Sequence, residues 1–190
     1  MGRKKRIIIL GSFLASLWSL PAWAGDIKGK VTVKGATSGD IVVWVEGVKG
    51  TVPRDKPQIA QHGAKFTPSF MVLVAGQTID MPNDDKIAHN VFSPSKTKKF
   101  NLGIYPKGTA KSVTFDKVGV VDMFCSIHRQ MKAKIVVVPN QYFSTTEPDK
   151  EFVIKNVPPD KYTLKFLYKK SEGSQSIVVT NNPLVVKLSL

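Results

Sequence analysis

The sequence predicts an all-β protein built from many short strands. Residues 25–190 contain 23 Val but only 7 Leu and 7 Ala, and β-branched side chains pack well on pleated sheets while losing rotamer freedom in helices. Short apolar runs recur between Gly, Pro, Asn and Asp residues. No long stretch places apolar residues at helical spacing. We therefore expect a β-sandwich or a β-barrel.

Each expected strand is a short run rich in branched or aromatic residues and bounded by turn-forming residues. Two polar segments are expected to be loops, the charge run 96–99 and the connector 140–149, which contains Pro148. In chain order, the expected strands are 27–34, 41–48, 66–75, 78–81, 89–93, 110–115, 120–125, 132–138, 151–156, 162–168, 174–180 and 184–190.

The first 24 residues have the pattern of a secretory signal peptide. Four bases at 3–6 precede an apolar run at 7–20, and Ala22-Trp23-Ala24 forms an A-x-A cleavage signal before Gly25. The alternative is a membrane anchor, but the run is shorter than the roughly 20 residues that a spanning helix needs. We expect cleavage, a periplasmic mature chain of residues 25–190, and no membrane span within it.

Composition and charge exclude several classes of protein. With 42% hydrophobic and 22% charged residues the chain can form a core, and the single cysteine, Cys125, excludes a disulfide scaffold. The net charge is +14; the first 24 residues hold four bases and no acid, so residues 25–190 have a net charge of +10. Nucleic acid is a poor partner for an exported chain, so we expect none.

One loop collects the residues that suggest chemistry. Cys125, His128 and Met131 lie within seven residues between two expected strands, and His89 begins another strand upstream. Two His, one Cys and a weak axial Met are the ligand set of a blue-copper electron-transfer site. Thiolate and imidazole bind copper in both oxidation states, and a long Met bond suits Cu(I) and Cu(II) alike.

Other interpretations exist for each of these residues. A lone Cys is usually a small buried hydrophobic residue, a lone His is often structural, and a Met beside a strand is often part of the core. Their combination in a chain with only three His and one Cys favours a metal site. Zinc is the alternative metal, but the Met thioether favours copper.

The motif resembles that of the cupredoxins, such as plastocyanin, pseudoazurin and amicyanin. Cys125-x2-His128-x2-Met131 follows an expected strand, and His89-Asn90 lies upstream. The resemblance covers 57–139 and implies a Greek-key β-sandwich domain at 56–139. Further segments look like periplasmic cupredoxin-domain proteins often labelled methylamine-utilisation proteins: 65–68, 74–78, 81–85, 89–93, 100–103 and 105–108.

The resemblance also implies roles for individual residues. His89, Cys125 and His128 would be the strong ligands of one type 1 copper ion, and Met131 the weak axial ligand. Asn90 matches a residue that braces the Cys loop by hydrogen bonding, although an ordinary turn-forming Asn would look the same. His62 is expected at the surface, and the other methionines of the copper domain, Met71, Met81 and Met123, are expected to pack in the core.

The two ends of residues 25–190 resemble parts of one further module. Residues 29–33, 40–45 and 152–164 are similar to strands of a carboxypeptidase-regulatory-like, or transthyretin-like, β-sandwich, although Asp160 replaces the usual Gly. We expect a discontinuous sandwich, 25–55 plus 140–190, with the cupredoxin domain inserted, because neither piece alone has enough strands for a stable sheet. The alternative is one enlarged cupredoxin sandwich.

The predicted function is electron transfer without substrate turnover. A basic rim around the motif, including Arg129 and Lys132, would speed encounter with an acidic redox protein or cytochrome, although a generally basic surface would also explain it. The alternative function is a copper-binding accessory or sensor protein that docks a partner through the flanking sandwich. A copper enzyme is not expected, because three His cannot supply a second, catalytic copper site.

Overall fold

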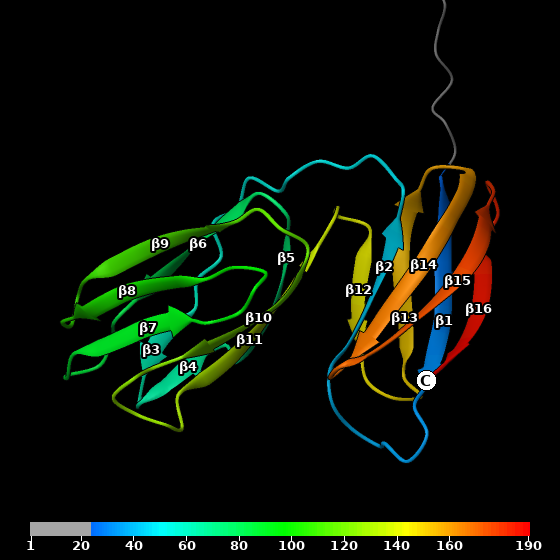
Figure 1. Ribbon diagram of the computed structural model, residues 1–190. Coiled ribbons are helices and arrows are strands. Elements are labelled where there is room, and N and C mark those ends of the chain that lie inside the picture. Colours follow the sequence, from blue (N-terminus) through cyan, green and yellow to red (C-terminus); the bar gives the residue numbers. More distant parts are fainter. Residues whose placement is uncertain (1–23) are drawn as a thin grey trace, which may run out of the picture.

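The computed structural model describes residues 24–190, and every regular element in that part of the chain is a β-strand. The prediction of an all-β fold is therefore confirmed. The strands form two units that lie side by side (Figure 1). The expected signal peptide lies outside the described residues except for Ala24. Among the described residues there is no helix of the length and apolarity needed to cross a membrane.

One unit contains strands from both ends of the described chain. Two sheets, with strand orders β13-β1-β16 and β12-β2-β14-β15, enclose a core that includes Ile27, Val31, Val43 and Phe166. β1 pairs with β13 and β16, and β2 pairs with β14, so early strands are bonded directly to late ones. The strands are β1 (Gly25–Thr32), β2 (Ile41–Glu46), β12 (Phe143–Thr146), β13 (Glu151–Val157), β14 (Asp160–Tyr168), β15 (Ser171–Val179) and β16 (Leu184–Ser189).

The other unit is formed by the middle of the chain. A sheet of order β5-β11-β10-β7-β8 lies with two smaller sheets, β3-β4 and β6-β9, around a second core that includes Phe115, Val121 and Ile135. The strands are β3 (Ala60–His62), β4 (Lys65–Thr67), β5 (Phe70–Val74), β6 (Gln77–Pro82), β7 (His89–Ser93), β8 (Phe100–Tyr105), β9 (Ala110–Phe115), β10 (Gly119–Phe124) and β11 (Lys132–Val138).

A third apolar cluster joins the two units. In β2, Ile41, Val43 and Val45 face the core of the first unit. Val42 and Trp44 face outward and pack with Val74, Val136 and Val138 of the second unit. β11 alternates in the same way, because Ile135 and Val137 belong to the second core. Strands buried on both faces read as continuous apolar runs, which explains Ile-Val-Val-Trp-Val in β2 and Ile-Val-Val-Val in β11.

Most strands lie close to their expected positions, with two kinds of difference. The expected strand 66–75 is divided into β4 and β5, because Pro68 has no N–H to continue a ladder. Three short strands were not expected: β3, β8 and β12. The last of these lies within 140–149, so the prediction that this whole segment is a loop was wrong; Phe143 to Thr146 pair with β2.

Candidate metal centre

The loop between β10 and β11 brings the Cys125 and His128 side chains close together. Antiparallel pairing of the two strands fixes both ends of the loop, because Phe124 lies opposite Lys132. Within it, the Cys125 N–H donates to the Met131 carbonyl at 3.3 Å, and the Met131 N–H donates to the His128 carbonyl at 3.0 Å. Cys125 and Met131 are buried, whereas His128 is half-buried. The loop therefore turns a thiol and a thioether inward and leaves one imidazole near the surface.

His89 approaches the loop from β7, the strand beside β10 in the same sheet. Its side chain is fully buried, and its Nε2 lies 2.7 Å from the Asp85 carboxylate. Asp85 also accepts hydrogen bonds from the N–H groups of Gly63 and Ala64, in the turn between β3 and β4. Although burial raises the pKa of Asp85, these hydrogen bonds and that from His89 outweigh burial and hold it below its ordinary value. A charged carboxylate therefore orients the His89 ring.

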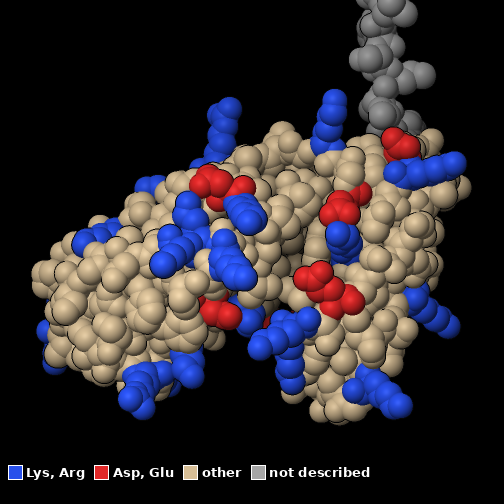
Figure 2. Space-filling model, in the orientation of Figure 1, with Lys and Arg blue, Asp and Glu red and all other residues tan. Residues whose placement is uncertain are grey.

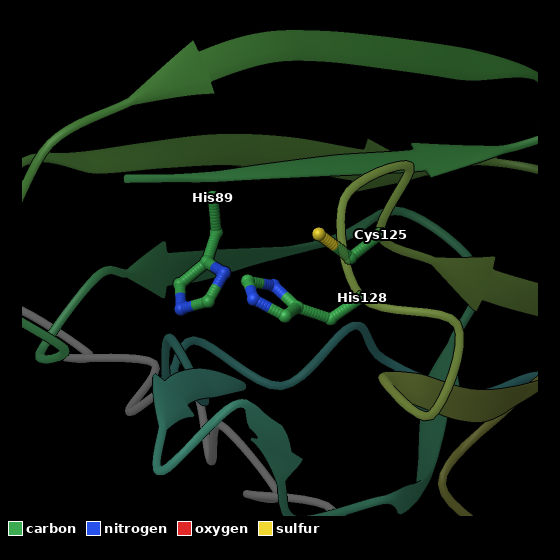
Figure 3. Close-up of side chains that lie close together, drawn as sticks. All are labelled: His89, Cys125 and His128. Atoms are coloured by element: carbon green, nitrogen blue, oxygen red, sulfur yellow. The ribbon is translucent and has the colours of Figure 1, made fainter. Parts of the chain in front are cut away.

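The three side chains converge on one point (Figure 3). One donor atom from each of His89, Cys125 and His128 lies within 4.8 Å of the other two. The centre of such a triangle is within about 2.8 Å of each atom, close to the ~2.0–2.3 Å of metal–nitrogen and metal–sulfur bonds. The two imidazole rings meet edge to face, with centroids 4.9 Å apart.

Two unpartnered nitrogen atoms indicate that this cluster can hold a metal ion. The Nδ1 atoms of His89 and His128 are buried and have no hydrogen-bond partner among the described residues. Buried polar atoms are normally paired, and Asp85 already occupies the other nitrogen of His89. Two free imidazole nitrogens beside a buried thiol fit a copper ion, since copper binds both donor types.

Asn90, the neighbour of His89, connects β7 to the Cys125 loop. Its Oδ1 accepts a hydrogen bond of 3.2 Å from the Ser126 N–H, and its Nδ2 donates to Asn101 at 2.8 Å. Asn101 in turn accepts from the Gly103 N–H. One buried amide thus ties the residue after Cys125 to both β7 and β8.

A buried polar network lies on the β8 side of His89, and sequence reasoning missed it. Tyr105 pairs with His89 across the strands, and its hydroxyl donates to the Met81 carbonyl and accepts from Gln61. Asn83 donates to the carbonyl groups of Tyr105 and Ile87. Burial raises the pKa of Tyr105 to about 12. The hydrogen bond from Gln61 lowers this pKa, and the nearby Cys125 makes a smaller contribution that raises it. The network fixes the backbone beside His89.

The remaining residues singled out in the sequence lie around this centre or away from it. Arg129 and Lys132 are exposed on the loop and at the start of β11. His62 is exposed at the end of β3, while Met81 and Met123 are fully buried. Sequence reasoning missed Asp85 as well; its position four residues before His89 was the available signal.

Comparisons with known proteins match the middle of the chain to one family. The family model described as copper binding proteins of the plastocyanin/azurin family matches residues 55–138. Amicyanin of Paracoccus versutus is 28% identical over 127 residues, which cover 65% of this chain and 88% of that protein.

Solved structures also resemble part of the chain. A reduced amicyanin variant has a TM-score of 0.42 at 20% identity, covering 50% of this chain and 98% of the other. A purple cupredoxin from Nitrosopumilus maritimus has a TM-score of 0.39 at 23% identity, covering 44% and 100%.

A copper-containing nitrite reductase from Thermus scotoductus has a TM-score of 0.43 at 24% identity, covering 48% of this chain but only 24% of the reductase. The match to the family model and the thiol–imidazole cluster agree on the same segment of this chain. Residues 55–138 therefore match the cupredoxins, the plastocyanin/azurin family of copper-binding proteins, which supports a general role in blue-copper electron transfer.

Proposed function

We propose that this protein is a periplasmic carrier of single electrons that holds one type 1 copper ion. His89, Cys125 and His128 would be the strong ligands, and Met131 the weak axial one. The observation that carries this proposal is the convergence of a buried thiol with two imidazole Nδ1 atoms that have no other partner among residues 24–190. When bound, copper supplies a centre that accepts and releases one electron.

The residues of the chain would prepare that centre in three ways. Asp85 holds Nε2 of His89 and so leaves Nδ1 free for the metal. Asn90 holds the backbone after Cys125. Burial of His89, Cys125 and Met131 excludes water, so that little reorganisation accompanies a change of charge. Outer-shell support of this kind typically tunes metal affinity and potential.

His128 is the proposed route by which electrons enter and leave. It is the least buried of the four proposed ligands, and the exposed residues Ile127 and Arg129 flank it in the loop. Figure 2 shows Lys and Arg side chains spread over both units. An acidic redox protein or a cytochrome would be attracted to such a surface, with Arg129 and Lys132 nearest the motif.

A carrier without catalytic activity is consistent with the histidine count. The chain has three His; two belong to the cluster, and His62 is exposed on a separate hairpin. We propose that no second copper site forms within the chain and that the protein is not an enzyme.

The two units are proposed to be an inserted copper domain, 56–139, and a discontinuous sandwich, 25–55 plus 140–190. Direct pairing of β1 with β13 and β16 supports this division. We further propose that residues 1–24 are a cleaved signal peptide that directs the chain to the periplasm.

The test is a Cu(II) titration of the purified protein followed by visible absorption. Wild type is expected to show an intense thiolate-to-copper band that Cys125→Ser and His128→Ala both lose. His62→Ala is the control, because it removes an imidazole outside the cluster, and should keep the band. Absence of the band from wild type, or its persistence in Cys125→Ser, would contradict the proposal.

A second candidate function is a copper-binding accessory or sensor protein. It is favoured by an exposed face on the sheet β13-β1-β16, where Val153 and Val185 are 36% and 73% exposed beside a groove of about 440 Å³. A simple carrier does not need such a second module. Rapid electron exchange with a soluble cytochrome would favour the carrier, whereas copper binding without exchange would favour the accessory role.

A further inference from the structure

A polar groove of about 380 Å³ lies beside the Cys125 loop, outside the metal cluster. Two segments line it, one running from β4 toward β5 and the other joining the loop to β11. The Lys134 N–H donates to the Ser69 carbonyl at 2.9 Å and holds the two segments together. The lining residues are Lys65, Phe66, Thr67, Ser69, Gln130 and Lys132.

The groove carries positive charge that no carboxylate of its lining balances. Lys65 and Lys132 are both exposed, no Asp or Glu lines the groove, and neither lysine forms a salt bridge with any residue of 24–190. By contrast, Lys134, two residues further along β11, pairs with Asp122 at 2.8 Å. Two unpaired ammonium groups on opposite segments attract an anion from outside the chain.

The other polar side chains of the groove are hydrogen-bond donors without partners. The hydroxyl groups of Thr67 and Ser69 and the amide of Gln130 make no side-chain hydrogen bond within the described residues, and all three residues are exposed. Hydroxyl and amide groups beside ammonium groups suit a carboxylate, which accepts several hydrogen bonds at once.

Both segments of the groove are also close in sequence to the metal cluster. Gln130 and Lys132 flank Met131 in the chain. Lys65 follows directly on Gly63 and Ala64, whose N–H groups hold Asp85 against His89. An anion in this groove would therefore be next to the loop that contains His128.

We propose that this groove anchors carboxylate side chains of an acidic electron-transfer partner and so holds that partner beside His128. The proposal rests on the electron-carrier function and names the surface that the partner contacts. A protein partner is favoured over an anionic lipid, because the one apolar residue of the groove, Phe66, is buried and offers nothing for insertion into a bilayer.

A hexaglutamate peptide is the probe for binding, followed by amide chemical shifts of the protein with and without copper. Shifts are expected at residues 65–69 and 130–132, and they should be lost in the double variant Lys65→Gln/Lys132→Gln. The matched control is Lys34→Gln/Lys170→Gln, which removes the same charge from exposed turns of the other unit and should keep the shifts. Shifts confined to other surfaces would overturn the proposal.

Oxidation of the Cu(I) protein by hexacyanoferrate(III) provides the kinetic test. One electron passes from Cu(I) to Fe(III), giving Cu(II) and Fe(II), and no proton is transferred. At low ionic strength the rate should fall about three- to tenfold in Lys65→Gln/Lys132→Gln and less than about twofold in the control, and the difference should shrink at high salt. An equal loss in both variants would contradict a local groove.

The two measurements separate failure of the groove from failure of the carrier function. Peptide binding at the groove with slow oxidation of every variant would remove the electron-carrier function and leave the anion site. Fast oxidation that is insensitive to Lys65 and Lys132 would support the electron-carrier function and remove the groove as the docking site. Co-sedimentation with phosphatidylglycerol vesicles, lost in the groove variant and unaccompanied by peptide binding, would assign the groove to lipid and overturn the proposed partner.

Discussion

Asp85 Oδ2 lies 2.7 Å from His89 Nε2 and thus places a carboxylate directly behind an imidazole of the metal cluster. The carboxylate is itself held by two backbone N–H groups of the β3–β4 turn. A carboxylate bonded to a ligating histidine fixes the ring and makes it a stronger donor. If His89 binds the metal as proposed, Asp85 connects the β3–β4 hairpin to the electronic properties of the centre.

Replacing Asp85 with Asn should weaken Cu(II) binding about 10-fold, within the 10–100-fold range typical of such partners. The Asn side chain retains an oxygen that accepts from Nε2, but it lacks the negative charge. A negative charge beside the centre favours Cu(II) over Cu(I). The reduction potential should therefore rise, by about 59 mV for each tenfold difference between the two oxidation states. Competition titration and voltammetry measure the two quantities. Asp84→Asn, an exposed neighbour with the same change of charge, should change neither.

Loss of the Asn90 side chain should destabilise the Cys125 loop even without metal. Asn90→Ala leaves the Ser126 N–H without its partner and removes one of the two hydrogen bonds that Asn101 Oδ1 accepts, at a cost of about 1–2 kcal/mol in the free energy of unfolding. Urea unfolding of the copper-free protein measures this. Ser126→Ala keeps the backbone N–H and should lie within about 0.5 kcal/mol of wild type; an equally large loss there would argue against the bond.

The Trp44 side chain is packed at the contact between the two units, but its indole N–H is not hydrogen-bonded to any described residue. It is 6% exposed and packs in the cluster of Val136, Val138 and Leu167, yet its Nε1 has no partner among the described residues. Trp44→Ala should cost about 3–5 kcal/mol. Trp44→Phe keeps most of the apolar contact and removes the unpaired N–H, so it should cost less than about 1.5 kcal/mol. Equal losses of stability for the two variants in urea unfolding would contradict this prediction.

Tyr105 should make the protein less stable at alkaline pH. Burial raises its pKa to about 12 from an ordinary value of 10.0, so the unfolded chain releases this proton first. The stability that Tyr105 provides is present below pH 10 and is lost as the pH rises toward 12, by at most about 2–3 kcal/mol. In Tyr105→Phe this part of the decline should disappear. The free energy of unfolding of the copper-free wild type and variant should be measured between pH 8 and 11.5. Parallel curves would refute the role of Tyr105.

The sequence predicted best the strands whose burial pattern is regular. β1 alternates apolar and polar residues, and β2 and β11 are continuous apolar runs, so both kinds stand out from the turns. The missed strands lack these patterns. β8 is largely exposed and contains Gly103 with a φ of 67°, and β12 is Phe-Ser-Thr-Thr at a sheet edge. Their pairing depends on neighbours distant in sequence.

The metal cluster was predictable in part, for a related reason. Cys125, His128 and Met131 share one loop, so their proximity follows from chain connectivity. His89 was selected from only three His in the chain. The bonds that Asp85 accepts from Gly63 and Ala64, like the Gln61–Tyr105 bond, join residues 21 or more positions apart. No local pattern indicates that such distant polar residues meet in the folded chain.

Because β11 contributes alternate residues to two cores, cutting the proposed copper domain out of the chain would uncover one of them. A fragment of residues 56–139 would present Val74, Val136 and Val138 to water along one sheet face, with Phe70 and Val72 beside them. Exposed strands of this composition associate with one another. A soluble fragment for spectroscopy would need polar replacements on that face. A fusion of the fragment to another protein would need an apolar surface on that protein to cover the same face.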